Sequence, residues 1–162
     1  MASIYQGCYA TLVATISPDD GSCLFSVAPD NMRLGEMWRS LVEDCSQLRL
    51  KFDTDIFPAI SGLAKPFAQA LGCFYFAGFW EKTLLTDLSW FAYSVPVSMR
   101  PRPEEWRAPS WSWASVKSAV SFTKNVDVRG ACGLVDLQYV SKDKNMAGEL
   151  ASAVIALREK VI

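Results

Sequence analysis

The chain of 162 residues is 51% hydrophobic, 12% aromatic and 20% charged, and it carries a formal net charge of −1. This composition is typical of one folded domain and unlike that of disordered segments, which are rich in charge and poor in aromatic residues. The balanced charge argues against a nucleic-acid or acidic-membrane partner, and the absence of histidine from the sequence excludes Ser-His-Asp, Cys-His and HExxH chemistry.

The cysteines and the apolar segments give predictions about the cellular compartment and about metal binding. The five cysteines include no Cys-x-x-Cys pair, so we interpret them as reduced thiols and expect no zinc site. No basic region of a signal peptide precedes the first apolar residues, and the longest apolar run, 66–80, is too short to span a bilayer. The sequence therefore predicts a cytoplasmic protein without a membrane span, a metal or a cofactor.

The first 25 residues predict the end of a helix at 2–7, a strand at Tyr9–Ile16 and a turn at 18–21. The strand is rich in Thr, Val, Leu and Ile and carries no charge. After it, apolar residues recur every three or four positions from Asn31 to Leu50, which indicates an amphipathic helix.

Two further helices are predicted before residue 93. Asp53 or Thr54 is expected to cap a short turn, after which a helix should run from 59 to 71 and close at Gly72. Another helix is predicted from 80 to 90. Its buried side would be formed by Leu84, Leu88 and Phe91, with Lys82 and Asp87 in water.

Residues 107–115, Arg-Ala-Pro-Ser-Trp-Ser-Trp-Ala-Ser, form the most distinctive segment of the chain. Because alternate residues of a strand share a face, we predict a strand on which Trp111 and Trp113 lie side by side. Pro109 would keep the preceding residue extended. We interpret the two tryptophans as core residues, with an aromatic binding platform as the alternative.

The prolines and the alternating pattern around this segment favour loops and strands. Residues 94–106 are rich in proline and should be extended or looping. Apolar and polar residues alternate at Ser118–Phe122 and at Gly133–Val140, as in strands. The last segment, 147–162, has a helix-forming composition, yet its alternating Ala153, Ile155 and Leu157 also fit a strand.

The run Arg107–Ser115 resembles the hallmark of the fungal heterokaryon-incompatibility (HET) domain proteins, in which a similar run follows the domain core. Further stretches agree with the order of motifs in this family, and together they span nearly the whole chain. They are Met1–Tyr5 leading into Ala10–Thr15, Asp55–Ala64, Phe76–Trp80 with Leu84, Leu85 and Trp90, and Arg100-Pro101.

Two parts of the family pattern are missing. The Met-x-x-Ile-Tyr stretch lies well inside the family domain, after an acidic motif that contains Cys and Gln, whereas here it starts at Met1. An Arg-x-Trp-x-x-Gln-Glu-Arg-Leu block is also absent after Phe25. We therefore expect the distal part of a larger protein, either a divergent short relative or a truncated gene product.

The resemblance implies a single domain, 1–162, in three regions: the end of a HET-like core at 1–25, a helical region at 26–93 and a β-rich region at 94–162 that includes the tryptophan strand. Asn145–Glu149 matches a family stretch that precedes a strand, which favours a strand within 147–162. The predicted fold class is α+β, with a few helices packed on a small, mostly antiparallel sheet that carries the two tryptophans.

The resemblance also implies a non-enzymatic role in fungal non-self recognition and the associated cell death. The alternatives are a residual NAD-cleaving enzyme, since the family core is similar to TIR-type folds, and a remnant without activity. We predict no catalytic, cofactor-binding or metal-binding residue, although Glu43 and Glu81 would be the first carboxylates to test for NAD cleavage. The residues assigned to a structural motif are Arg107, Pro109, Ser110, Trp111, Ser112 and Trp113.

The expected partner is a protein whose identity the sequence leaves open. In longer relatives, the neighbours of the strand Tyr9–Ile16 would come from the segment that is missing here. An unpaired strand edge offers backbone donors and acceptors to another chain, so the sequence also predicts self-association through this edge.

Overall fold

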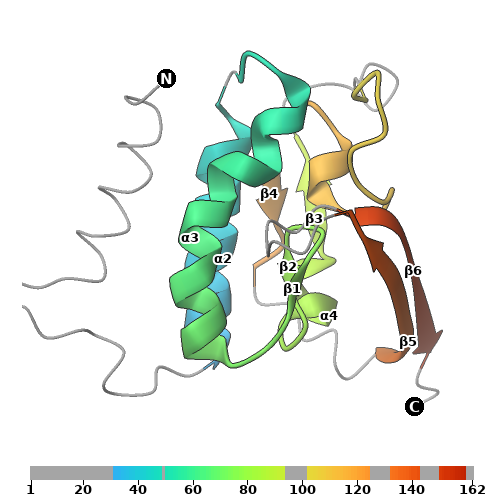
Figure 1. The fold of residues 1–162 in the computed structure, drawn as a ribbon. Helices are drawn as coiled ribbons and strands as arrows, with labels where there is room; N and C mark the ends of the chain where they lie inside the picture. The colour runs from blue at the N-terminus through green and yellow to red at the C-terminus, as the bar shows by residue number, and fades with distance from the viewer. Residues whose placement is uncertain (1–30, 49, 94–101, 125–131, 143–149, 160–162) are drawn as a thin grey trace, which may run out of the picture.

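The computed structural model describes residues 31–48, 50–93, 102–124, 132–142 and 150–159 (Figure 1). In these ranges, helices α2 (Asn31–Ser46), α3 (Ile56–Leu71) and α4 (Leu84–Asp87) accompany strands that all pair antiparallel. The predicted α+β class is therefore confirmed. The predictions for residues 1–25 lie outside the described residues.

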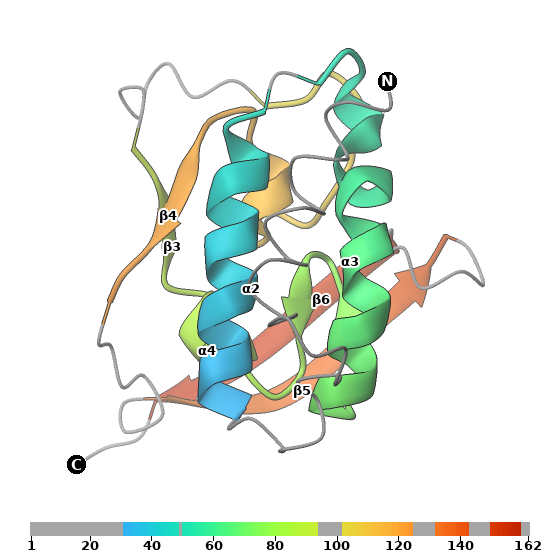
Figure 2. The ribbon, with the colours of Figure 1, turned by 90° about the vertical axis from the view of Figure 1, so that its left-hand side faces the viewer.

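The strands form three separate two-stranded sheets in the described part of the chain. The pairs are β1 (Tyr75–Phe76) with β2 (Phe79–Trp80), β3 (Trp90–Ala92) with β4 (Val120–Phe122), and β5 (Cys132–Ser141) with β6 (Leu150–Glu159). Two 3-10 helices, η2 (Asp53–Asp55) and η4 (Trp113–Ser115), complete the regular structure of the described residues. In Figures 1 and 2, α2 and α3 lie side by side over the β1–β2 hairpin, and the β5–β6 ribbon lies on the other side of that hairpin.

The long helices follow the apolar periodicity of the sequence. In α2 the buried residues include Leu34, Trp38 and Val42, on the face that the periodicity predicts. The helix ends at Ser46, earlier than predicted. Helix α3 begins three residues before the predicted start, so that Pro58 lies in its first turn. A proline is tolerated there, because the N–H group that it lacks would have no partner within the helix. Gly72 closes α3 in the left-handed conformation, as predicted.

The predicted helix from 80 to 90 is wrong for most of its length. Only the four residues of α4 are helical, between strands β2 and β3. Asp87 was expected in water, yet its exposed fraction is 0% because Arg39 and Thr83 bind its carboxylate. Phe91 was expected to be buried with Leu84, but it points out of β3 and is 45% exposed.

The tryptophan segment is not a strand, which corrects the sequence prediction. A backbone hydrogen bond from Ser112 N to the carbonyl of Pro109, 2.9 Å long, forms a turn, and η4 follows. The hydroxyl of Ser112 accepts a bond from Ala114 N and so caps η4, which replaces the ladder bonds of a strand. Trp111 and Trp113 consequently lie on no common strand face and on no sheet.

The C-terminal strands agree with the sequence. β4 lies within the predicted 118–122, and β5 covers the predicted 133–140. Residues 150–159 form β6, so the strand interpretation of the last segment is confirmed.

The hydrophobic core surrounds the β1–β2 hairpin. All four of its strand residues are buried, and its two-residue turn, Ala77-Gly78, has positive φ at both positions, as a type I′ turn requires. The ring of Trp38 makes edge contacts with Phe67 and Trp80, at centroid distances of 5.2 and 5.1 Å. A turn of this kind normally lies in water, where its carbonyl groups bind solvent. Because this turn is buried, its carbonyl groups need hydrogen-bond donors from within the protein.

Replacing Gly78 by alanine should destabilise the protein by more than about 2 kcal/mol. A Cβ at this position would lie 2.3 Å from Nε1 of Trp113, and the φ of the residue is +88°. The matched control is Gly62→Ala in α3, where an added Cβ meets no atom within 4 Å. Because alanine is the better helix former, this variant should gain about 0.5 to 1 kcal/mol. Denaturant unfolding measures both, and a Gly78→Ala variant as stable as the original chain would contradict the buried turn.

Candidate functional site

The segment Arg107–Ser115 supplies donors to the buried turn of the β1–β2 hairpin. The hydroxyl of Ser112 donates to the carbonyl of Ala77 at 2.7 Å, and Nε1 of Trp113 donates to the carbonyl of Gly78 at 3.1 Å. The same Gly78 carbonyl also accepts Nε1 of Trp38 at 3.0 Å. Both carbonyls of the turn are thus satisfied.

Arg107 joins this segment to η2, which precedes α3. Its guanidinium donates to three backbone carbonyls, those of Ala114 at 2.6 Å, Asp53 at 2.7 Å and Val116 at 2.9 Å. Burial lowers the pKa of Arg107, and the nearby charge of Asp53 opposes this effect. Three bonds to neutral oxygens in different directions make Arg107 a structural clamp.

The other predicted motif residues lie around this clamp. Trp111 is half-buried; its ring stacks on Phe79 at a centroid distance of 6.0 Å, and its carbonyl accepts Nε1 of Trp90 at 2.7 Å. Pro109 is buried, and Ser110 is exposed with its carbonyl bound to Ser115. The core interpretation therefore suits Trp113, which is 2% exposed, better than Trp111.

The sequence reasoning missed the partners of the motif. Trp38, Ala77 and Gly78 were not predicted to contact it, because they lie far from it in the sequence and Ala-Gly is not one of the pairs typical of a two-residue hairpin turn.

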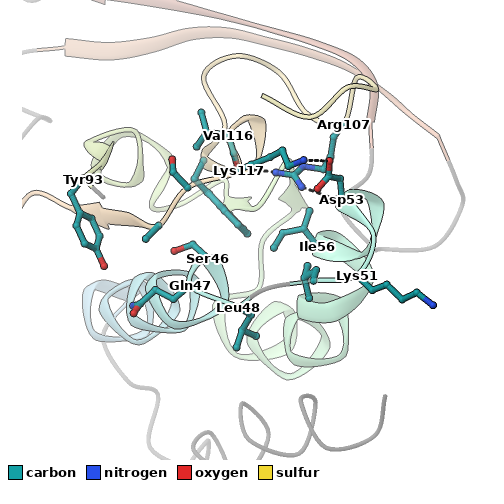
Figure 3. A pocket seen from close by; sticks show the side chains of 14 residues that line it. Ser46, Gln47, Leu48, Lys51, Asp53, Ile56, Tyr93, Arg107, Val116 and Lys117 are labelled. Atoms are coloured by element: carbon teal, nitrogen blue, oxygen red, sulfur yellow. Dashed lines mark hydrogen bonds and ion pairs between the residues drawn. The ribbon is translucent and has the colours of Figure 1, made fainter. Parts of the chain in front are cut away.

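A pocket of about 700 Å³ opens beside Arg107 (Figure 3). Ser46 at the end of α2 forms one wall together with Gln47 and Leu48, and the stretch from Val116 to Ala119 forms another. Lys117 binds the carboxylate of Asp53 at 2.8 Å. The side chain of Lys51 points away from the pocket in Figure 3, and its ammonium lies 5.1 Å from the centre of the Phe52 ring.

The hydrogen-bonding groups of this pocket are largely occupied. Arg107 is bound to carbonyls and Lys117 to a carboxylate, whereas the buried hydroxyl of Ser118 has no hydrogen-bond partner. The pocket can therefore accommodate a small group mainly by its shape, since the oxygen of Ser118 is buried. Asp53 is the one carboxylate among its labelled side chains and is paired with Lys117, so these side chains include no carboxylate pair for acid–base chemistry.

A second polar cluster lies between α2 and α4. The carboxylate of Asp87 accepts Nη1 of Arg39 at 2.7 Å and the hydroxyl of Thr83 at 2.5 Å. Burial raises the pKa of Asp87 from 3.8 to about 6, and the two hydrogen bonds limit the rise. The cluster is a buried ion pair that connects the two helices.

Glu43 and Glu81, the first carboxylates to test for NAD cleavage, lie in different surroundings. Glu43 accepts the hydroxyl of Ser121 at 2.7 Å and the backbone N–H of Phe122 at 3.0 Å, so it binds β4. Glu81 is exposed, and its backbone N–H bonds to Phe74. The structure does not bring them together with the motif residues. Cys45 and Cys73 form no disulfide bond in the described part of the chain.

Comparisons with protein-family models, with curated proteins and with solved structures find no match to this chain. In the described ranges, no helix is both long and apolar enough to cross a membrane. The same residues hold no group of three or more cysteine and acidic side chains that could bind a metal ion.

Replacing Arg107 by lysine should destabilise the protein by about 2 to 4 kcal/mol, although the charge is kept. A lysine ammonium on its flexible stem cannot reach three carbonyls that a planar guanidinium spans, so buried acceptors lose their donors. Arg102→Lys, at an exposed position, is the matched control and should change stability by less than about 0.5 kcal/mol. Equal effects of the two variants in thermal unfolding would refute the clamp.

Replacing Arg39 by methionine should destabilise the protein by about 3 to 5 kcal/mol near pH 8, because the buried carboxylate of Asp87 loses its partner. Near pH 5 the loss should be smaller, since a pKa of about 6 leaves the folded Asp87 mostly protonated there. The folded pKa exceeds the unfolded one, so the contribution of Asp87 to stability is full below its unfolded pKa of 3.8 and is lost as the pH rises through about 6.

The control for this experiment is Arg33→Met, on an exposed position of the same helix. It should show no comparable dependence on pH. Urea unfolding of both variants and of the original chain across this pH range gives the comparison, and a destabilisation by Arg39→Met that is constant with pH would contradict the role of Asp87.

Proposed function

We propose that this protein is a non-enzymatic interaction module of the HET type, which acts in fungal non-self recognition and the associated cell death. The observation that carries the proposal is the set of hydrogen bonds made by 107–115, the segment that resembles the family. Arg107, Ser112 and Trp113 all direct their polar groups to backbone carbonyls of the core. These hydrogen bonds support a structural role for the motif, in which it fixes the shape of the module and provides no group for catalysis.

The acidic residues support the same proposal. Glu43 is bound to β4, and Asp87 is paired with Arg39, so both carboxylates serve the packing of elements. General acid–base catalysis would require such a group to face a substrate. The module would act in the cytoplasm on a protein partner. Self-association through Tyr9–Ile16, which lies outside the described residues, remains part of this proposal.

Inducible expression of the full chain in fungal hyphae tests the function. Entry of a viability dye should rise after induction, because the module triggers cell death, and total NAD should not fall before the dye enters. Trp113→Ala should abolish the effect by unfolding the core, since deletion of a buried aromatic side chain costs about 3 to 5 kcal/mol. Trp106→Ala, at a position 48% exposed, is the matched control and should keep the effect.

Two outcomes would overturn the proposal. If hyphae survive with the folded chain present, the module does not trigger death. If the purified chain consumes NAD and either Glu43→Gln or Glu81→Gln stops the reaction, the protein is an enzyme. The purified chain should instead leave NAD intact, with Glu43→Gln reducing only thermal stability.

A further inference from the structure

The β5–β6 ribbon carries an unusual share of exposed apolar surface. Half of the twelve large apolar side chains that are exposed in the described residues lie on these two strands. They are Leu134, Val135, Tyr139, Val140, Val154 and Leu157. One face of the ribbon packs on the core, where the ring of Tyr139 stacks on Phe76 at a centroid distance of 5.7 Å.

The edge of β6 contrasts with the edge of β4. On β4, the N–H groups of Val120 and Phe122 that do not serve the ladder are bound by Ser46 and Glu43 of α2. In the described part of the chain, β6 pairs with β5 alone, and no side chain of α2, α3 or α4 binds its other edge. Among the described residues, one strand edge is therefore covered, and the other has no strand or helix side chain bound to it.

The centre of β6, residues 152–157, lacks the features that protect strand edges; a bulge at Ala151 precedes it, and the charged Arg158 and Glu159 follow it. Residues 150–157, Leu-Ala-Ser-Ala-Val-Ile-Ala-Leu, contain no charge, no proline and no glycine. Edge strands in monomeric proteins usually carry charges, prolines or bulges that prevent pairing with another chain. In addition, a two-stranded ribbon is marginally stable, whereas four strands form a stable sheet.

We propose that β6 is a self-association edge, at which two copies of this chain pair β6 antiparallel to β6 and form one four-stranded sheet. An open strand edge requires an extended backbone as its partner, and a second β6 provides one. A two-fold axis perpendicular to the sheet keeps the core-facing sides of both ribbons on the same side. Because 150–157 is uncharged, this pairing opposes no like charges along its centre.

Val154 provides the test, because it lies at the middle of β6 and so close to the proposed two-fold axis. It is 65% exposed, so a polar side chain should be tolerated there in the monomer. Sedimentation equilibrium of the full chain between about 1 and 200 μM should show a monomer–dimer equilibrium. Val154→Lys should weaken the dimer by about tenfold or more, because two ammonium groups then face each other.

The matched control is Val140→Lys. Val140 is 58% exposed and lies on the same outer face, since it pairs with Ser152, but it belongs to β5, one strand farther from the axis. This variant should dimerise within about twofold of the original chain. Thermal unfolding checks that each lysine variant remains folded.

A charge-reversal pair sharpens the test. Val154→Glu should also weaken the homodimer, but an equimolar mixture of Val154→Lys and Val154→Glu proteins should associate as a heterodimer, because opposite charges then meet across the axis. Backbone amides of β6 should exchange more slowly at high protein concentration, at alternate residues only, since every second N–H points to the edge.

Three results would overturn the proposal. A monomer at every concentration would exclude self-association. Equal weakening by Val140→Lys and Val154→Lys would show that the outer face, not the edge, forms the contact. Loss of the dimer in Val13→Lys but not in Val154→Lys would assign the contact to Tyr9–Ile16.

Discussion

The carbonyl oxygen of Gly78 accepts hydrogen bonds from two indole rings, and the arrangement of the core depends on this shared acceptor. Trp38 lies 40 residues before it and Trp113 lies 35 residues after it. The bonds place helix α2 and the segment 107–115 on the same turn. A type I′ turn can be buried only where its carbonyls have internal donors, so the aromatic core and the motif require each other.

Helix α2 carries the second set of constraints. Its apolar face packs on the hairpin through Trp38, while polar residues beside that face bind other elements. Glu43 and Ser46 close the edge of β4, and Arg39 reaches Asp87 next to α4. One helix can therefore hold two of the three small sheets, without a continuous sheet to connect them.

Elements whose structure depends on local pattern could be predicted, and elements that depend on distant partners could not. The periodicity of α2 and the alternation in β5 identify these elements without tertiary information. The segment at 107–115 has a strand-like pattern, but the buried carbonyl of Ala77 and the cap on Ala114 engage Ser112 instead. Asp87 looked like a solvated residue because its partner, Arg39, lies 48 positions away. For the same reason, the motif residues could be recognised as structural while their acceptors remained unpredicted.

The buried turn has a consequence for synthesis of the chain on the ribosome. Residues 75–80 emerge more than 30 residues before Ser112 and Trp113, which the turn needs. Until then, the carbonyl of Ala77 can be satisfied only by water and that of Gly78 only by Trp38 and water, so the core around the turn stays partly open to solvent. The nascent chain therefore cannot complete its core as it elongates, and during this interval it is a natural substrate for chaperones that bind exposed aromatic segments.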